Sequence, residues 1–339
     1  MADTGKYMAD SGRYEVMQYR RCGRSGLMLP AISLGLWHNF GEITPEETKR
    51  SILRTAFDCG ITYFDIADNY GPPYGAAETS FGKIMREDFL PYRDELIIST
   101  KAGYDMWPGP YGNYGSRKHL LAGIDGSLKR LGLDYVDIFY HHRPDPETPM
   151  EETADALAQI VRQGKAIYIG ISNYHVKETK EMTALLKERH VPFVIHQPNY
   201  SLLNRWIETE GLDQTLLEEG IGSVVFKPLE QGLLTGKYQN GIPEDSRMKK
   251  DPRYLKEESR KTDTLERVSR LSEVAKDRGQ SLAQMSIAWV LKNPAVTSAL
   301  IGASRPSQIT ENVESLKHLE FTEEEERRIR EILKQENAS

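Results

Sequence analysis

Short apolar runs rich in β-branched residues recur along the chain, and each is followed by a longer segment whose apolar positions repeat with helical spacing. Runs that are apolar at every position are typical of strands buried on both faces. Their alternation with helices predicts a parallel sheet covered on its outer side. The predicted strands are residues 31–36, Ile61–Asp65, Leu96–Lys101, Val136–His142, Ala166–Ser172, Phe193–His196, Ser223–Phe226 and Ser298–Ile301.

Local signals mark the ends of several intervening helices. Thr44 and Glu47 have the spacing of a capping box, so one helix is predicted to begin at Thr44 and to stop at Gly60. Glycine follows the last turn of many helices because it adopts a left-handed conformation without strain. By the same reasoning, two more helices are predicted between Ser116 and Gly132 and between Thr148 and Gly164.

The alternation amounts to about eight strand–helix units over roughly 300 residues, which fits a closed (β/α)8 TIM barrel better than an open doubly wound sheet. Residues 19–30 precede these units and have the pattern of a β-hairpin, which we expect to close the floor of the barrel. No long linker rich in Gly, Ser or Pro divides the chain, so residues 19–339 are predicted to form a single domain. Residues 1–18 contain an imperfectly repeated heptad, MADTGKY then MADSGRY, and are predicted to be a flexible or surface-lying extension.

Charge, hydropathy and cysteine content exclude several kinds of binding partner and environment. The 339 residues carry a formal net charge of -6 without a basic block, which argues against nucleic acids and anionic membranes as partners. No apolar run of 18 residues is present, so membrane insertion is not expected. Cys22 and Cys59 are the only cysteines, and the N-terminus has no apolar targeting segment, so we expect reduced thiols and a cytoplasmic protein.

Candidate chemistry lies where the predicted strands end, because barrels of this kind carry their active sites at the carboxyl ends of the strands. Asp65, Lys101 and His142 end three of them, and Tyr70 lies in the loop after Asp65. Pairing of Asp65 with Lys101 would remove the cost of burying either charge alone. A lysine beside Tyr70 is expected to lower the pKa of that phenol from about 10, so that it donates a proton near neutral pH. With His142 donating a hydrogen bond to a polarised oxygen, these side chains predict a proton-delivery site for a carbonyl group.

Each of these residues also has an ordinary interpretation. Loop tyrosines are mostly surface residues, and lysines after strands are mostly solvated. The adjacent His141 and His142 fit a packed pair or part of a metal site, but no third ligand lies at a typical spacing, so no metal is predicted. A catalytic role is favoured because all four residues lie at or just after the ends of strands.

Several motifs in order make the sequence similar to the aldo-keto reductases, from about Tyr19 to about Leu319. They are GITYFDIADNYG, IISTK, LGLDYVDIFYHHRPDP, GKAIYIGISN, QPNYSLLNR, VVFKPLEQGLLTGKY and LIGASRPSQITENV. The resemblance implies a (β/α)8 reductase that uses NADP(H) without a Rossmann domain. By this match the catalytic tetrad is Asp65, Tyr70, Lys101 and His142. His141 departs from the family pattern, in which a non-titratable residue usually precedes the catalytic histidine.

The resemblance also implies a cofactor site. The residues are Ser172, Asn173 and Gln197 at the nicotinamide carboxamide, Phe226 on the nicotinamide ring, Leu229, Gln231 and Gly232 along the pyrophosphate, Ser304, Arg305 and Gln308 at the 2′-phosphate, Glu311 and Asn312 near adenine, and Trp37, Lys237 and Gly302 as further contacts. Residues 302–304 precede a predicted helix, whose backbone N–H groups and dipole favour anions. The Arg305 fork suits a phosphate and favours NADP over NAD, the alternative being a capped helix with a solvated arginine. GLLTGKY lacks the P-loop spacing, and no G-x-G-x-x-G follows a strand.

Within the family, the sequence most resembles the branch with bacterial L-glyceraldehyde 3-phosphate reductases and potassium-channel β-subunits. This implies NADPH-dependent reduction of small aldehydes or ketones such as glyceraldehyde 3-phosphate or methylglyoxal, in a homo-oligomer of tetramer or octamer size. The expected walls of the substrate pocket are Trp37, His38, Tyr104, Trp107 and His141. The aromatic loop GYDMWPGPYGNYG is predicted to be a mobile lid, or else to pack on a neighbouring subunit.

Two other functions stay open at this stage. A regulatory module that binds NADPH and serves a membrane channel has the same barrel, and fold alone does not separate it from an enzyme. An aldolase-type barrel would use Lys101 to form a Schiff base, which is disfavoured because Asp65 would keep Lys101 protonated.

Overall fold

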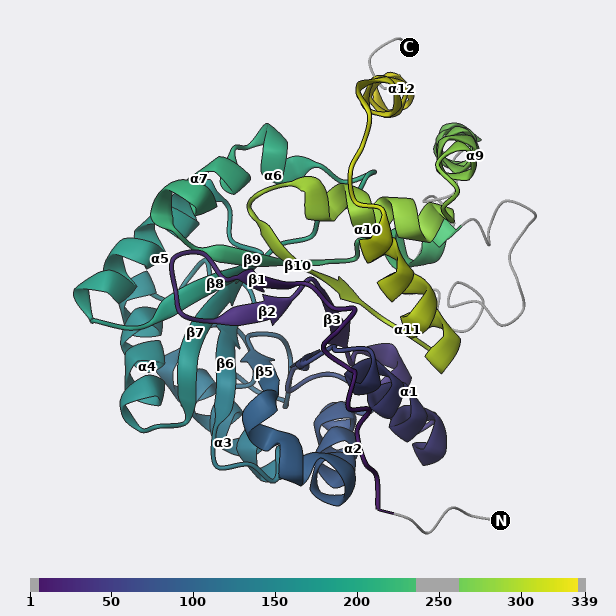
Figure 1. Cartoon of the computed structure of the whole chain (residues 1–339). Coiled ribbons are helices and arrows are strands. Elements are labelled where there is room, and N and C mark those ends of the chain that lie inside the picture. Colours follow the sequence, from purple (N-terminus) through teal and green to yellow (C-terminus); the bar gives the residue numbers. More distant parts are fainter. Residues whose placement is uncertain (1–5, 236–261, 335–339) are drawn as a thin grey trace.

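Eight parallel strands form a closed barrel in the part of the chain that the structure, a computed structural model, describes, namely residues 6–235 and 262–334. Their order around the barrel is β10-β3-β4-β5-β6-β7-β8-β9 (Figure 1). The strands are β3 (Ile32–Gly35), β4 (Tyr63–Asp65), β5 (Ile97–Ala102), β6 (Val136–His141), β7 (Ala166–Ser172), β8 (Phe193–Gln197), β9 (Gly222–Phe226) and β10 (Val296–Ile301). The predicted (β/α)8 barrel is confirmed.

Helices surround this barrel on its outer side (Figure 1). Those described are α1 (Glu46–Asp58), α2 (Ala76–Ile84), α3 (Arg117–Leu131), α4 (Met150–Arg162), α5 (Val176–Glu188), α6 (Trp206–Thr209), α7 (Leu212–Glu219), α9 (Thr262–Asp277), α10 (Leu282–Lys292), α11 (Pro306–Val313) and α12 (Glu323–Leu333). Short helical turns add η1 (His38–Phe40), η2 (Met85–Phe89), η3 (Leu90–Glu95), η4 (Glu230–Thr235) and η6 (Glu314–Lys317). None of the helices within the described ranges combines the length and the apolar character that crossing a membrane requires.

The sequence signals located one helix start correctly and another wrongly. At α3, the Ser116 side chain accepts a hydrogen bond from the His119 N–H, and Gly132 follows the helix with a φ of 68°, as predicted. At α1 the predicted capping box is wrong, because Pro45 occupies the N-cap position and no side chain caps the helix. The Lys49 N–H donates to the Pro45 carbonyl at 3.2 Å, so Thr44 lies before the cap.

A β-hairpin covers one end of the barrel and lies in front of the strands in Figure 1. It consists of β1 (Tyr19–Arg21) and β2 (Met28–Pro30), which pair antiparallel. Leu27 and Leu29 are buried and pack in one apolar cluster with Tyr63 of β4 and Tyr140 of β6. The predicted hairpin and its place at the barrel floor are confirmed.

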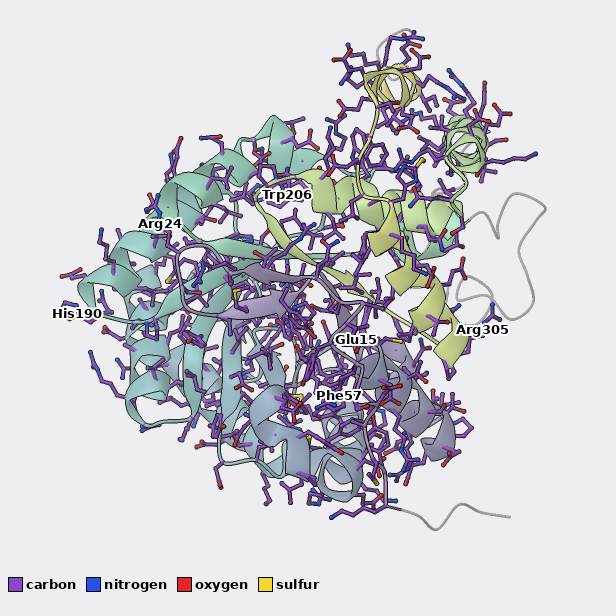
Figure 2. All side chains as sticks on the ribbon, viewed as in Figure 1. Glu15, Arg24, Phe57, His190, Trp206 and Arg305 are labelled. Atoms are coloured by element: carbon purple, nitrogen blue, oxygen red, sulfur yellow. The ribbon has the colours of Figure 1, made fainter. Side chains whose placement is uncertain are left out.

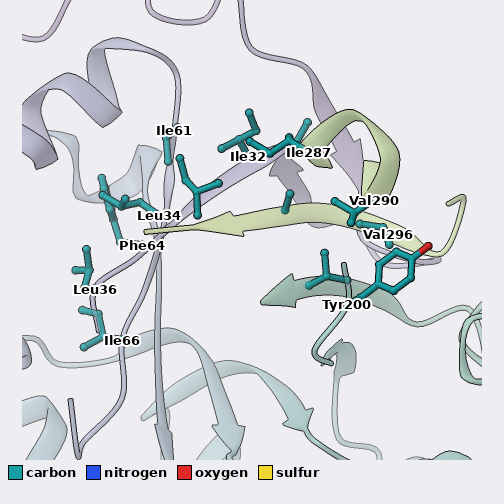
Figure 3. Packing of buried hydrophobic residues seen from close by; sticks show 14 of the residues in the cluster. Ile32, Leu34, Leu36, Ile61, Phe64, Ile66, Tyr200, Ile287, Val290 and Val296 are labelled. Atoms are coloured by element: carbon teal, nitrogen blue, oxygen red, sulfur yellow. The ribbon is translucent and has the colours of Figure 1, made fainter. Parts of the chain in front are cut away.

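The larger core fills the layer between the barrel and its helices. Figure 3 shows Leu34 of β3 close to Phe64 of β4, with Ile32 at the start of the same strand and Val296 of β10 alongside Val290 of α10. All five of these side chains are at most 2% exposed. Burial of both strand faces explains why the strands read as continuous apolar runs in the sequence.

The segment before the hairpin lies along the outside of the barrel (Figure 1). The Tyr7 hydroxyl donates to Asp58 at 2.6 Å, and the Tyr7 ring packs 5.3 Å from the ring of Phe89. Arg13 lies over the ring of Phe57 at 5.0 Å and pairs with Glu95. These contacts hold residues 7–13 against α1, η2 and η3.

Candidate active site at the carboxyl ends of the strands

A buried ion pair lies at the centre of the site. The Lys101 ammonium, from β5, donates to Asp65 Oδ2 at 2.5 Å and to the Ile66 carbonyl at 2.7 Å. Both charged side chains are completely buried. Tyr70 Oη lies 3.5 Å from Lys101 Nζ, so the lysine connects the carboxylate to the phenol. The structure therefore brings together three residues that the sequence separates by up to 36 positions.

Neutral donors fix the other oxygen of the Asp65 carboxylate. Asp65 Oδ1 accepts hydrogen bonds from Ser99 Oγ at 2.7 Å, from Gln197 Nε2 at 3.0 Å and from the Tyr63 hydroxyl at 3.4 Å. With Lys101 on Oδ2, the carboxylate has four donors from the three strands β4, β5 and β8, which offset the cost of burying its charge. Sequence reasoning missed Ser99 and Tyr63, although each lies two positions from a tetrad residue and so on the same face of its strand.

The expected lowering of the Tyr70 pKa is wrong. Burial raises the pKa of Tyr70 well above its ordinary value, and the charge of Asp65 raises it further. The Lys101 charge, 3.5 Å from Tyr70 Oη, does not reverse this direction, and the shorter contacts of Lys101 are with Asp65 and Ile66. Burial also lowers the pKa of Lys101, and Asp65 offsets part of that effect. Tyr70 is thus a protonated phenol across the physiological range, which is the form that donates a proton.

His142 completes the predicted tetrad. Its ring lies edge-on to the Tyr70 ring, with 6.0 Å between centroids. Burial, followed by the charge of Lys101, lowers the pKa of His142 well below its usual range. At neutral pH the ring is therefore uncharged and has one N–H to donate to a polarised oxygen.

His141 is not a wall of the pocket, contrary to expectation. Side chains alternate along β6, so Tyr140 and His142 face the barrel interior while His141 faces the helices. The His141 ring meets the Tyr174 hydroxyl at 2.5 Å and lies against Gly115, where an added Cβ would come within 2.8 Å of it. Burial lowers the pKa of His141 to about 3, so it stays neutral. His141 is a packing residue of the outer layer.

Three polar residues connect the tetrad to the next strands. Asn173 has a φ of 60° and donates through Nδ2 to the His142 carbonyl at 3.0 Å. Ser172 Oγ donates to the Gln197 carbonyl at 2.8 Å, and the Gln197 amide reaches Asp65. The predicted carboxamide-binding residues therefore form one network with two members of the tetrad.

The loop after β9 holds the next predicted cofactor residues. Phe226 ends β9, and the backbone then takes left-handed conformations at Gln231 (φ 52°) and Gly232 (φ 101°). The Gly232 N–H donates to the Leu229 carbonyl at 2.8 Å, which closes a tight turn. Lys237, which was predicted to contact the cofactor, lies outside the described residues.

The segment between β10 and α11 carries an exposed arginine and a glycine with free space around it. Arg305 is exposed, and Figure 2 shows its side chain directed away from the molecule at the end of α11. No ion pair or hydrogen bond of the Arg305 side chain is found among residues 6–235 and 262–334. Gln308 accepts from the Ser304 N–H at 2.8 Å, and space is open around Gly302. On α11, Glu311 is exposed, and Asn312 is buried in the helix face toward the core.

Two of the residues predicted to line the substrate pocket lie beside rings of the tetrad. The Tyr104 ring meets the His142 ring edge-on at 4.6 Å, and the Trp37 ring lies 6.1 Å from the Tyr70 ring. The His38 ring lies against the Trp37 ring, tilted by 39° with 3.9 Å between centroids. Trp107 packs on His119 of α3 at 5.0 Å, so it lies in the outer part of the loop.

A second acidic group behind Lys101 was not recognised from the sequence. Glu78 of α2 is buried, accepts from Thr100 Oγ1 and pairs with Arg130 at 2.6 Å. Beside it, burial and then the charge of Glu78 raise the pKa of Asp68 well above its usual range. Among the described residues, no group of three or more His, Cys, Asp or Glu is arranged to hold a metal ion.

Comparison with known sequences agrees with this geometry. Residues 31–334 match the profile of the Aldo/keto reductase family, and they include the four tetrad residues. The chain belongs to the aldo/keto reductase family. It is therefore an oxidoreductase.

Similar members of the family have two kinds of name. The L-glyceraldehyde 3-phosphate reductase of Escherichia coli O157:H7 is 59% identical over 327 residues, which is 94% of this chain and 93% of that protein. The protein of the same name from Escherichia coli K12 is 58% identical over the same shares. A probable voltage-gated potassium channel subunit beta of Arabidopsis thaliana is 40% identical over 307 residues, 88% of this chain and 91% of that protein.

Proposed function

We propose that this aldo/keto reductase uses NADPH to reduce small aldehydes and ketones to alcohols, with glyceraldehyde 3-phosphate or a methylglyoxal-like carbonyl as substrate. The single observation that carries the proposal is the contact of Lys101 with both Asp65 and Tyr70. Support for the substrate class comes from the two relatives above that are named L-glyceraldehyde 3-phosphate reductase. The homo-oligomer expected from the resemblance is part of the proposal, and light scattering after gel filtration measures its size.

The proposed roles follow from protonation states and positions. Tyr70 holds the proton that the carbonyl oxygen receives, because its phenol stays protonated. Neutral His142 donates a hydrogen bond that orients that oxygen. Lys101, held by Asp65, supplies a positive charge 3.5 Å from Tyr70 Oη that stabilises the phenolate left after donation. The cofactor, when bound, supplies the hydride for the carbonyl carbon.

The residues present fit a nicotinamide cofactor with a 2′-phosphate. The carboxamide would be held by Ser172, Asn173 and Gln197, which already form one hydrogen-bonded network. The exposed Arg305 guanidinium, without an ion pair among the described residues, suits the 2′-phosphate. Arg305→Ala is expected to weaken NADPH binding more than NADH binding, as measured by fluorescence titration.

The test is NADPH oxidation with methylglyoxal and with glyceraldehyde 3-phosphate, for wild type and Tyr70→Phe. Loss of a general acid lowers kcat by roughly 100- to 10,000-fold, while NADPH binding should persist. Tyr74→Phe is the matched control, because Tyr74 lies in the same loop but is 58% exposed. Equal activity of Tyr70→Phe and Tyr74→Phe would refute the role of Tyr70.

A second candidate is a regulatory module that binds NADPH and serves a membrane channel. The relative named as a potassium channel subunit beta favours it. The complete tetrad favours the enzyme, since a binding module has no need of a proton donor. Tight NADPH binding without turnover of either aldehyde in the wild type would support the module.

A further inference from the structure

Arg143 carries a positive charge at the mouth of the site that the tetrad does not use. It follows His142 directly, beyond the end of β6. Its Nε donates at 3.0 Å to the carbonyl of Gly103, the residue after β5. The guanidinium therefore lies across the carboxyl ends of the two strands that supply Lys101 and His142.

Two tyrosine rings pack on the guanidinium. The Arg143 guanidinium carbon lies 4.2 Å from the centre of the Tyr104 ring and 4.3 Å from that of Tyr114. Nη2 donates to Asn113 Oδ1 at 2.7 Å. Such an arginine is already ordered, so it loses little side-chain entropy when it binds an anion.

Part of the same guanidinium is available to bind a ligand. Among residues 6–235 and 262–334, Nη1 of Arg143 has no hydrogen-bond partner and no carboxylate pairs with the side chain. Arg143 is also partly exposed. A preorganised fork with free donors and an unneutralised charge is the arrangement that binds phosphate groups.

Arg143 is also within reach of a bound substrate. The Tyr104 ring that stacks on Arg143 touches the His142 ring at 4.6 Å, so the guanidinium and the imidazole lie on neighbouring sides of one tyrosine. A three-carbon aldehyde phosphate spans roughly 5 Å from carbonyl carbon to phosphorus, at bond lengths near 1.5 Å. The exposed Arg305 adjoins β10, which is diametrically opposite β6 in the barrel.

We infer that Arg143 binds the phosphate of a phosphorylated aldehyde substrate and sets the preference for that class over unphosphorylated aldehydes. The inference rests on the function proposed above and deepens it. Tyr104 and Tyr114 position the guanidinium, and the phosphate monoester takes up the free edge. The alternative is that Arg143 only holds the aromatic loop of residues 103–115 in place.

The experiment compares glyceraldehyde 3-phosphate with glyceraldehyde, which differ only in the phosphate. Wild type, Arg143→Met and Arg143→Lys are assayed with saturating NADPH, and the ratio of the two kcat/KM values is the readout. Loss of charge-assisted hydrogen bonds should reduce this ratio in Arg143→Met by about 10- to 100-fold, mainly through KM for the phosphorylated substrate. Arg143→Lys keeps the charge without the fork, so its ratio should lie between the other two.

Inorganic phosphate gives an independent probe. It should inhibit wild-type reduction of glyceraldehyde competitively, and the inhibition should weaken in Arg143→Met by a factor similar to the change in the ratio. An unchanged ratio, an equal loss on both substrates, or a weakened NADPH affinity would each overturn the inference. A wild type that reduces both aldehydes with equal kcat/KM would overturn it while leaving the reductase intact. A wild type that binds NADPH but reduces neither aldehyde would overturn the proposed function itself, and this inference with it.

Discussion

Removing either partner of the buried pair of Asp65 and Lys101 should make the free energy of unfolding depend on pH, with opposite slopes in the two variants. Both side chains are completely buried and meet at 2.5 Å. In Lys101→Met, the carboxylate keeps its neutral donors Ser99 and Gln197 but loses its counter-charge. In Asp65→Asn, the ammonium keeps only the neutral acceptors on Ile66 and Tyr70.

The loss in the free energy of unfolding has an upper limit, because the group left without its partner can become neutral. At pH 7, protonating an aspartate from an unfolded pKa of about 3.9 costs about 4 kcal/mol. Deprotonating a lysine from about 10.4 costs about 5 kcal/mol. Removal of one partner of a buried pair costs about 3 to 5 kcal/mol in general, which agrees with this limit.

The sign follows from the protons bound in each state. In Lys101→Met, the native Asp65 holds a proton that the unfolded chain releases, so the loss shrinks as pH falls toward 4. In Asp65→Asn, the native Lys101 lacks a proton that the unfolded chain holds, so the loss shrinks as pH rises toward 10. Each slope approaches, at most, about 1.4 kcal/mol per pH unit.

The measurement is the free energy of unfolding in denaturant, from pH 6 to 8, for wild type, both single variants and the double variant. The double variant has no orphaned charge, so it should be more stable than the sum of the single losses implies and should show neither slope. Lys49→Met is a matched control, because Lys49 is 6% exposed and bonds only neutral acceptors, Gly41 and Ser80. Additive losses, or slopes of the same sign in the two single variants, would refute the reasoning.

Three further predictions concern other parts of the molecule. Because His142 has a strongly lowered pKa and Tyr70 a strongly raised one, kcat/KM for an aldehyde without a phosphate should be flat between about pH 6 and 9. A fall toward the acidic end of this window would contradict the assignment of His142, and a fall toward the basic end that of Tyr70. Gly170→Ala would place a Cβ 2.3 Å from the Tyr140 ring and should destabilise by about 1 to 3 kcal/mol in denaturant unfolding, whereas Gly26→Ala meets open space and should be nearly neutral. Tyr7→Ala should destabilise by about 2 kcal/mol and Tyr7→Phe by about 1 kcal/mol, since only the former loses the aromatic packing; no effect of either would indicate the flexible extension.

Much of the barrel could be predicted because its strands obey a simple rule. A parallel strand covered on both faces must be apolar throughout, so β7 was predicted with the same ends that it has in the structure. Polar residues that end such strands are rare, which made Lys101 and His142 visible as candidates. The helix start at α1 was missed because Thr44 and Pro45 both suit positions near an N-terminus, and only the backbone hydrogen bond of Lys49 distinguishes them.

Other features of the site depend on distances that the sequence does not contain. The direction of the Tyr70 pKa shift reflects burial and the nearby charge of Asp65, neither of which a motif reveals. The outward direction of His141 could have been predicted, because alternation along β6 puts Tyr140 and His142 on one face and His141 on the other. Arg143 was visible in the sequence only as the residue after His142, and its significance comes from the two tyrosine rings that the fold places around it.

The hairpin at the barrel floor has a consequence for the electrostatics far above it. Leu29 packs in the same cluster as Tyr63 and Tyr140, whose hydroxyls bond each other at 2.8 Å, and Tyr63 in turn reaches Asp65. The hairpin therefore keeps water away from the charged pair at this end of the barrel. As a result, the electrostatic interaction of Lys101 with Tyr70 is only weakly screened. Truncating Leu29 would let water enter from this end and raise the local dielectric constant. The electrostatic effect of Lys101 on Tyr70 would then weaken, although no residue of the active site had been changed.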